Sequence, residues 1–262
     1  MISIVQTDLI STTMVTKFLL PLNLQVQQGD ATAILISWSG TATIASIADT
    51  DNNVYVAGPT VSNGSGGTQL NVAVYYCISL SVNTAPFVIA TITFSAQATR
   101  INAAFLDLNG ATFQIQLDQS ANGSASFDGG AETLTPNIPI TISSPYEVLI
   151  AIVGLSSATS ATPNTGWIQI PGKMTVGVFY RTMGSVTGSY TASPCTLGSM
   201  IRSAMAIIGL GTTLVVQAGN IIAPRFPDTF SPRLADYFYD SLQNDPTFVA
   251  DPYGPRPFTW TS

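Results

Sequence analysis

Consecutive short apolar segments between residues 31 and 109 constrain the fold of this chain more than any other feature. They read ATAILISWS, TATIASIADTDNNVYVAGP, QLNVAVYYCISLS, FVIATITFSAQ and RINAAFLDLNG. Each is rich in β-branched, aromatic and small apolar residues, and clusters of Gly, Asn, Asp, Ser or Pro separate them. This pattern is typical of consecutive antiparallel strands and predicts an all-β fold.

Five motifs within this stretch match a known domain pattern. They are an ISW strand at residues 36–38, a D-x-x-x-N-x-Y turn at 49–55, a YY strand at 75–76 and a strand of the VTVTFS type at 90–95. The fifth, at residues 101–110, begins with Ile and ends with Gly, like the I-x-x-x-E-x-x-G strand of that pattern. The pattern resembles a jelly-roll-like β-sandwich domain of secreted bacterial proteins and some phage proteins, most of them uncharacterised. Asp107 stands where the last family strand usually has Glu.

The resemblance covers roughly residues 10 to 215, because the segments 146–155 and 175–210 are similar to the closing strands of the family. It implies a jelly-roll-like antiparallel β-sandwich in a surface or virion protein, and it implies no catalytic residues. All-β sandwiches commonly reach this size as single domains. We therefore expect one β-sandwich domain over residues 1–219.

The composition changes after Gly219. Residues 220–262 hold seven of the sixteen prolines and three of the eight basic residues. Within them, 231–242 is the one segment that predicts a helix: Ser231 can cap it, Pro232 suits its first turn, and its apolar residues recur on one face. The sequence thus predicts an extended C-terminal arm that contains one short helix.

A single short helix between Pro-rich and aromatic-rich segments cannot form a core of its own. We therefore expect the arm to dock, either back over its own sandwich or on a neighbouring subunit. Aromatic and Arg side chains are typical anchors of protein interfaces. The predicted docking residues are Arg225, Phe226, Phe230, Leu234, Tyr237, Phe238, Leu242, Tyr253, Phe258 and Trp260.

The charge of the chain limits its partners. Charged residues make up 8% of the chain, against about 25% in an average protein. The net charge is −6 and no basic run occurs, which argues against nucleic-acid binding because that needs a basic surface. A surface so poor in charge is either neutral and polar or covered by other protein, so we expect a homo-oligomer in contact with other virion proteins.

No targeting signal is predicted. The segment before residue 20 lacks a basic region ahead of its apolar residues, and Asp8 interrupts it, which argues against a secretory signal peptide. The apolar stretches 147–155 and 203–210 are shorter than the ~20 residues that span a bilayer. The expected location is a virion, assembled after synthesis in the host cytoplasm; the alternative is the extracellular surface.

The turn at residues 48–53 presents the strongest metal candidates of the chain. Asp49, Asp51 and Asn53 alternate as in the start of a calcium loop. An EF-hand would require Gly at the sixth position and Glu at the twelfth, where Val54 and Thr60 stand instead. We favour a hairpin turn whose Asx side chains bond their own backbone, and we predict no metal and no cofactor.

Other polar and aromatic residues receive structural interpretations. We predict a solvated loop over residues 118–132, which holds Asp118, Asp128 and Glu132. Trp38 and Trp167 are the stacking candidates for a glycan, with Trp38 favoured as a core residue. The two cysteines, Cys77 and Cys195, are expected to be buried and unbridged.

The chain has few residues in arrangements typical of catalysis. No histidine is present, and no Gly-x-Ser-x-Gly motif occurs, so the commonest general base and nucleophile arrangements are missing. We therefore expect no enzyme activity. The leading hypothesis is a virion structural protein, such as a decoration, collar, tail or fibre subunit of a phage-like particle. The alternative is a carbohydrate-binding or adhesin module of a bacterial surface protein, with a glycan as its partner.

Overall fold

The computed structural model describes residues 2–22, 30–78, 88–109, 114–128, 135–171, 176–199 and 201–213. The chain divides into two units, Met1–Val215 and Val216–Ser262. The predicted helix at 231–242 and all ten predicted docking residues lie outside the described residues. Within the described ranges the elements are strands and one short 3₁₀ turn, Gly66–Thr68, and the strands pair antiparallel. The predicted all-β fold is confirmed.

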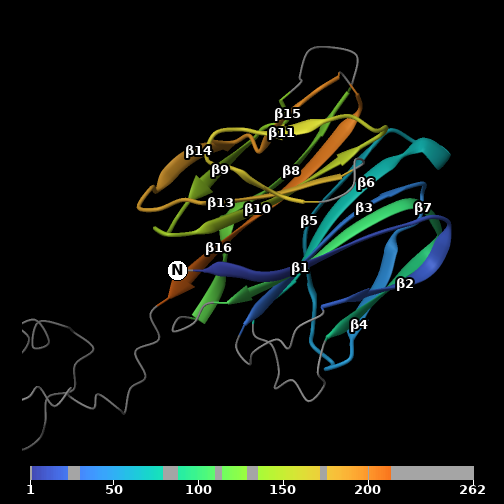
Figure 1. Ribbon diagram of the computed structural model, residues 1–262, viewed down its shortest axis with the longest axis horizontal. Coiled ribbons are helices and arrows are strands. Elements are labelled where there is room, and N and C mark those ends of the chain that lie inside the picture. The colour runs from blue at the N-terminus through green and yellow to red at the C-terminus, as the bar shows by residue number, and fades with distance from the viewer. Residues whose placement is uncertain are drawn as a thin grey trace, which may run out of the picture. The chain divides into compact units, whose positions relative to one another are not determined.

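The first seven strands form one folded sheet (Figure 1). Its main layer has the order β1-β7-β3-β6-β5, and β2 and β4 pair with β7 off this path. The strands are β1 (Ser3–Thr12), β2 (Val15–Pro21), β3 (Ala31–Ser39), β4 (Ile44–Asp49), β5 (Val56–Asn63), β6 (Leu70–Cys77) and β7 (Ile89–Asn109). Strand β3 falls where the sequence pattern predicted a strand.

Strand β7 connects two layers of this sheet. Its first part pairs with β2 and β4, and its second part pairs with β1 and β3. Arg100 has a positive φ of 47° between these parts, and Met14 has a φ of 52° between β1 and β2. The prediction of two separate strands here was wrong, because one bent strand covers both segments.

The other nine strands form the second half of the fold. A five-stranded sheet has the order β12-β13-β10-β16-β8, and β14 pairs with β9 and β11 with β15. The strands are β8 (Gln114–Phe127), β9 (Ile138–Ile142), β10 (Val148–Leu155), β11 (Ala161–Pro163), β12 (Ile168–Ile170), β13 (Val176–Thr182), β14 (Gly188–Ala192), β15 (Cys195–Leu197) and β16 (Ser203–Thr213).

The predicted loop at 118–132 was wrong over its first ten residues, which continue β8 and pair with β16. Its Gly, Ser and Ala residues had indicated a flexible turn. They are small because β9 packs closely over the strand: a Cβ at Gly123 would lie 2.6 Å from Cγ2 of Ile138. A strand that needs such close approach often carries Gly.

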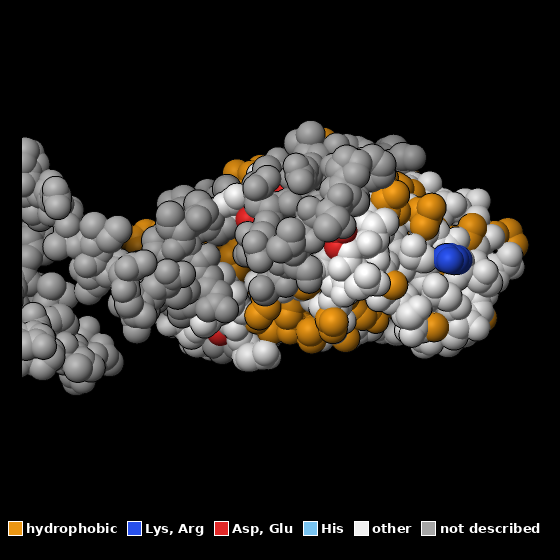
Figure 2. Space-filling view, turned by 90° about the horizontal axis from the view of Figure 1, so that it is seen from below, with side chains coloured by type: hydrophobic (Ala, Val, Ile, Leu, Met, Phe, Trp, Pro, Cys, Tyr) orange, Lys and Arg blue, Asp and Glu red, His pale blue; other side chains and the backbone are white. Residues whose placement is uncertain are grey.

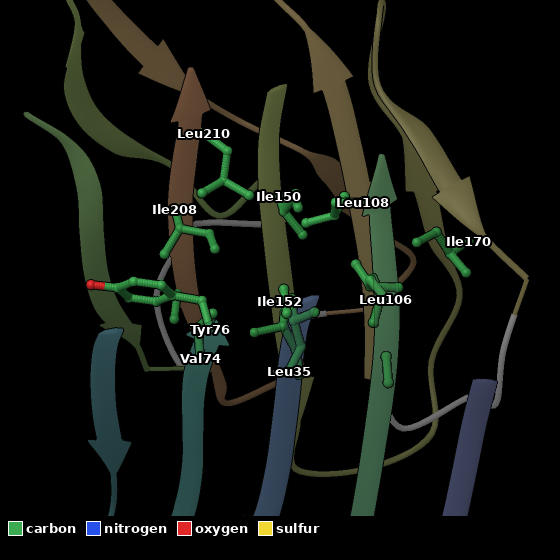
Figure 3. Close-up of a cluster of buried hydrophobic side chains, with 14 of the residues drawn as sticks. Leu35, Val74, Tyr76, Leu106, Leu108, Ile150, Ile152, Ile170, Ile208 and Leu210 are labelled. Atoms are coloured by element: carbon green, nitrogen blue, oxygen red, sulfur yellow. The ribbon is translucent and has the colours of Figure 1, made fainter. Parts of the chain in front are cut away.

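Three apolar cores hold four layers together. The central core lies between the two large sheets, where Leu35 and Leu106 from one half face Ile150, Ile152 and Ile208 from the other (Figure 3). A second core fills the space beneath β2 and β4, and a third lies beneath the β9–β14 and β11–β15 pairs. Each fully buried Leu or Ile side chain contributes roughly 2 kcal/mol to this packing.

Both large sheets are therefore covered on both faces. Every residue of β10 is buried. Strand β16 also contributes side chains to two cores. Cys77 and Cys195 are buried and unbridged, as predicted. In the part of the chain that is described, no helix is long and apolar enough to cross a membrane.

Candidate functional site

The Asp49 turn is the first of two buried acidic sites. The backbone N–H groups of Asp51 and Asn53 donate to Oδ1 of Asp49, at 3.0 and 2.9 Å. Nδ2 of Asn53 and the hydroxyl of Tyr55 donate to Oδ2, at 2.8 and 2.9 Å. The predicted bonding of an Asx side chain to its own backbone is confirmed. The predicted hairpin is wrong, because β4 pairs with β7 and β5 pairs with β6.

Tyr55 closes this turn against the second core. Its ring meets the ring of Phe105 edge-on, with centroids 6.4 Å apart. Burial, and then the neighbouring Asp49 carboxylate, raises the pKa of the Tyr55 hydroxyl far above its ordinary value. The hydroxyl therefore remains a hydrogen-bond donor to Asp49 throughout the pH range in which proteins are handled.

The geometry of the turn is better suited to stabilising the backbone through Asp49 than to binding calcium. Both carboxylate oxygens of Asp49 already accept two hydrogen bonds each. A cation would have to displace donors that the turn itself supplies. Among the residues whose placement is described, no three His, Cys, Asp or Glu side chains come together as a metal site would require.

The second acidic site joins Asp118 of β8 to Glu147, which directly precedes β10. The backbone N–H of Ser143 donates to Oδ2 of Asp118 at 2.8 Å, and that of Ser144 donates to Oε1 of Glu147 at 3.0 Å. Both acids are buried, with 8% and 0% of their surface exposed. They line a small cavity of about 200 Å³ together with Gln116, Leu117, Gln119, Ser143, Ser144 and Gly211.

Glu147 is the most perturbed acid of this site. Burial raises the pKa of its carboxyl from 4.5 to about 8, and the hydrogen bond and negative charge of Asp118 act in the same direction. Oε2 of Glu147 is buried and receives no donor from the surrounding protein. A proton held on Glu147 and shared with Asp118 satisfies both observations.

This arrangement can hold and release one proton near neutral pH. The predicted solvated loop is wrong at Asp118, which is buried on β8. Folding places Glu147, which directly precedes β10, beside Asp118 of β8. No local sequence pattern predicts this contact. The signal that could have indicated it is Gly209-Leu210-Gly211, two glycines at alternate positions of an apolar strand.

The prediction of Trp38 as a core residue is confirmed, and neither tryptophan is suited to the glycan stacking of the alternative hypothesis. Trp38 is 3% exposed and Trp167 is 5% exposed. Nε1 of Trp38 donates to the carbonyl of Ala42 at 2.7 Å, and its ring packs against Phe94 with centroids 5.6 Å apart. Both rings belong to apolar cores, so neither presents a face to a sugar.

An open groove runs along the outer pair β9–β14. It has a volume of about 320 Å³ and is lined by Pro139, Ile140, Thr141, Ser189, Tyr190 and Thr191. The guanidinium of Arg181 lies 5.3 Å from the centre of the Tyr190 ring, and its Nη1 donates to the carbonyl of Thr165 at 3.0 Å. Arg181 thereby fixes the aromatic side chain that borders the groove.

The fold and the two acidic sites define a layered, all-β sandwich protein with buried carboxyls. No protein-family model and no curated protein matches the chain.

Proposed function

We propose that this protein is a non-catalytic structural subunit of a phage-like virion, such as a decoration, collar, tail or fibre protein. It assembles as a homo-oligomer through its sandwich and its C-terminal arm. The observation that carries this proposal is the division of the chain. The first unit fills three cores with its own side chains, and the second has the aromatic and Pro-rich composition of a docking segment.

The surface of the sandwich supports this proposal. Neutral polar and apolar side chains dominate the described surface in Figure 2. Leu19 and Met14, at the β2 side of the fold, are 55% and 60% exposed, and Ile168 on the strand β12 is 52% exposed. A surface with so few charges is suited to contact with neighbouring protein subunits. The jelly-roll-like relationship belongs to the same proposal and rests on the five sequence motifs.

The test measures the solution mass of the full-length protein by light scattering at several concentrations. We expect a defined oligomer. The variant Tyr237→Ala with Phe238→Ala, which truncates the apolar face of the predicted helix, should fall to a smaller species. The matched control is Asp236→Ala with Asp240→Ala, because the helical pattern predicts both residues on the opposite, polar face of the helix, and it should leave the mass unchanged. A full-length protein that stays monomeric at every concentration would contradict the proposal.

The groove beside Tyr190 favours glycan binding as a second candidate. Hydroxyl-bearing side chains and an aromatic ring are the groups that recognise sugars, and the groove supplies both. The full-length protein should then bind a subset of a glycan array, and Tyr190→Ala should abolish that binding while Tyr146→Ala preserves it. An equal signal from both variants would exclude this groove as the binding site.

A further inference from the structure

The Asp118–Glu147 pair spans a strand that carries no side chain between the two acids. In the order β10-β16-β8, Gly209 of β16 pairs with Asp118 on one side and with Leu149 on the other. A Cβ at Gly209 would lie 3.4 Å from Oε2 of Glu147, and one at Gly211 would lie 3.4 Å from its Cγ. The two glycines therefore leave the space in which the carboxyls meet across β16.

The turn between β9 and β10 fixes the pair from the other side. Ser143 and Ser144 donate one backbone N–H to each acid. These bonds orient one oxygen of each carboxyl. The second oxygen of Glu147 is buried without a donor, which is costly for a charged carboxylate.

We propose that Asp118 and Glu147 form a proton-sharing latch that ties β8 to the start of β10 across β16, and that loss of the shared proton loosens this corner of the fold. Strand β16 ends at Thr213 and leads in sequence into the C-terminal segment. The latch therefore makes the pairing of β8 with β16 sensitive to pH.

Burial and Asp118 raise the pKa of Glu147, and together they outweigh the backbone N–H groups of Ser144 and Ser143, which lower it. Strand β8 contributes Asp118, which is the charged neighbour. Strand β16 contributes Gly209 and Gly211, and the β9–β10 turn contributes backbone N–H groups. Arg181 of β13 is directed elsewhere, to Thr165 and Tyr190. No described cation offsets the repulsion between the two acids once the proton leaves.

The sign of the pH effect follows from these groups. The folded protein keeps the proton on Glu147 up to about pH 8, whereas the unfolded chain releases it near 4.5. Between these values the unfolded state binds fewer protons than the folded state, so stability falls as the pH rises. Below this window the contribution of Glu147 is at its most favourable, and above about pH 8 the loss is complete.

The direct test is a carboxyl ¹³C NMR titration of the full-length protein labelled at glutamate. The chain has two glutamates, Glu132 and Glu147, so two signals appear and Glu132→Gln assigns them. We expect the Glu147 signal to titrate near pH 8, and to move to a lower pH in Asp118→Asn because a negative neighbour is removed. Titration of Glu147 near pH 4.5 would overturn the proposal.

A stability test needs no labelling. The melting temperature of EDTA-treated wild type should fall steadily from pH 5 to pH 8.5. Glu147→Gln retains the shape and a hydrogen donor, so it should lose most of this slope and become more stable than wild type at pH 8.5. Asp128→Asn, which removes an exposed acid beyond the end of β8, should keep the wild-type slope. Parallel wild-type and Glu147→Gln profiles would refute the latch.

Discussion

Asp49 in the N-terminal half and Glu147 in the C-terminal half are both buried carboxyls, yet their surroundings differ in kind. Asp49 accepts four hydrogen bonds, all from residues within six positions of it in the chain. Glu147 accepts a bond from Ser144, has its Oε2 buried without a donor, and faces a second acid from a distant strand. The number of donors, rather than burial alone, decides whether a buried acid stabilises the fold as a charge or requires a proton.

This difference in hydrogen bonding gives Asp49 and Glu147 different roles. A carboxylate whose acceptors are all used organises its turn and has little capacity left for a ligand. A carboxyl that shares a proton responds to its surroundings. The largest expected effects therefore come from the Asp49 turn, and the pH-dependent ones from the Asp118–Glu147 pair.

Removal of the Asp49 carboxylate should have the largest effect on stability. Asp49→Ala leaves two backbone N–H groups, the Asn53 amide and the Tyr55 hydroxyl without their acceptor. We expect a loss of about 4 kcal/mol in the free energy of unfolding, because unsatisfied donors at a buried site are costly. Chemical denaturation at pH 7 measures it. A loss of less than about 1 kcal/mol would show that the turn does not depend on this acceptor.

A methyl group at Gly209 should have the next largest effect. The added Cβ would lie 2.3 Å from the Cβ of Ala121, so β8 and β16 must separate. We expect Gly209→Ala to lose about 2 kcal/mol by overpacking, and the titration of Glu147 to move to lower pH as the acids part. Gly67→Ala is the control, since nothing lies within 4 Å of its added Cβ. Equal stability of both variants would contradict this close packing.

Loss of one donor from the Asp49 turn should have a smaller effect. Tyr55→Phe keeps the ring contact with Phe105 and removes a single hydrogen bond to a carboxylate that retains three others. We expect thermal unfolding to report a loss of about 1.5 kcal/mol. A loss as large as that of Asp49→Ala would mean that the Tyr55 hydroxyl, and not the backbone, holds the turn.

The smallest effect at low pH should come from Glu147→Gln. At pH 5 Glu147 is protonated in the folded protein, so an amide of the same shape replaces a neutral carboxyl. The change in unfolding free energy at this pH should stay under about 1 kcal/mol. The corresponding change Asp49→Asn places an NH₂ group among four donors and should cost about 2 kcal/mol. Equal costs at the two positions would remove the distinction between them.

Local patterns predicted most of the strands and the Asp49 turn. The boundaries of β3 and the complete burial of β10 follow from runs of apolar residues. The Asp49 turn was predictable because its donors lie within the same short segment. Composition misled the prediction at β8, where small residues indicated a loop although they are required by close packing of β9.

The sequence by itself determined the antiparallel strands, the low charge and the turn chemistry at Asp49, because each depends on residues near one another in the chain. Only the tertiary structure decided that β7 serves two layers, that Trp167 is buried, and that Asp118 meets Glu147 across the glycines of β16. These features depend on the pairing of strands distant in sequence. Local patterns do not encode such pairing, since it is set by the common burial of several apolar faces.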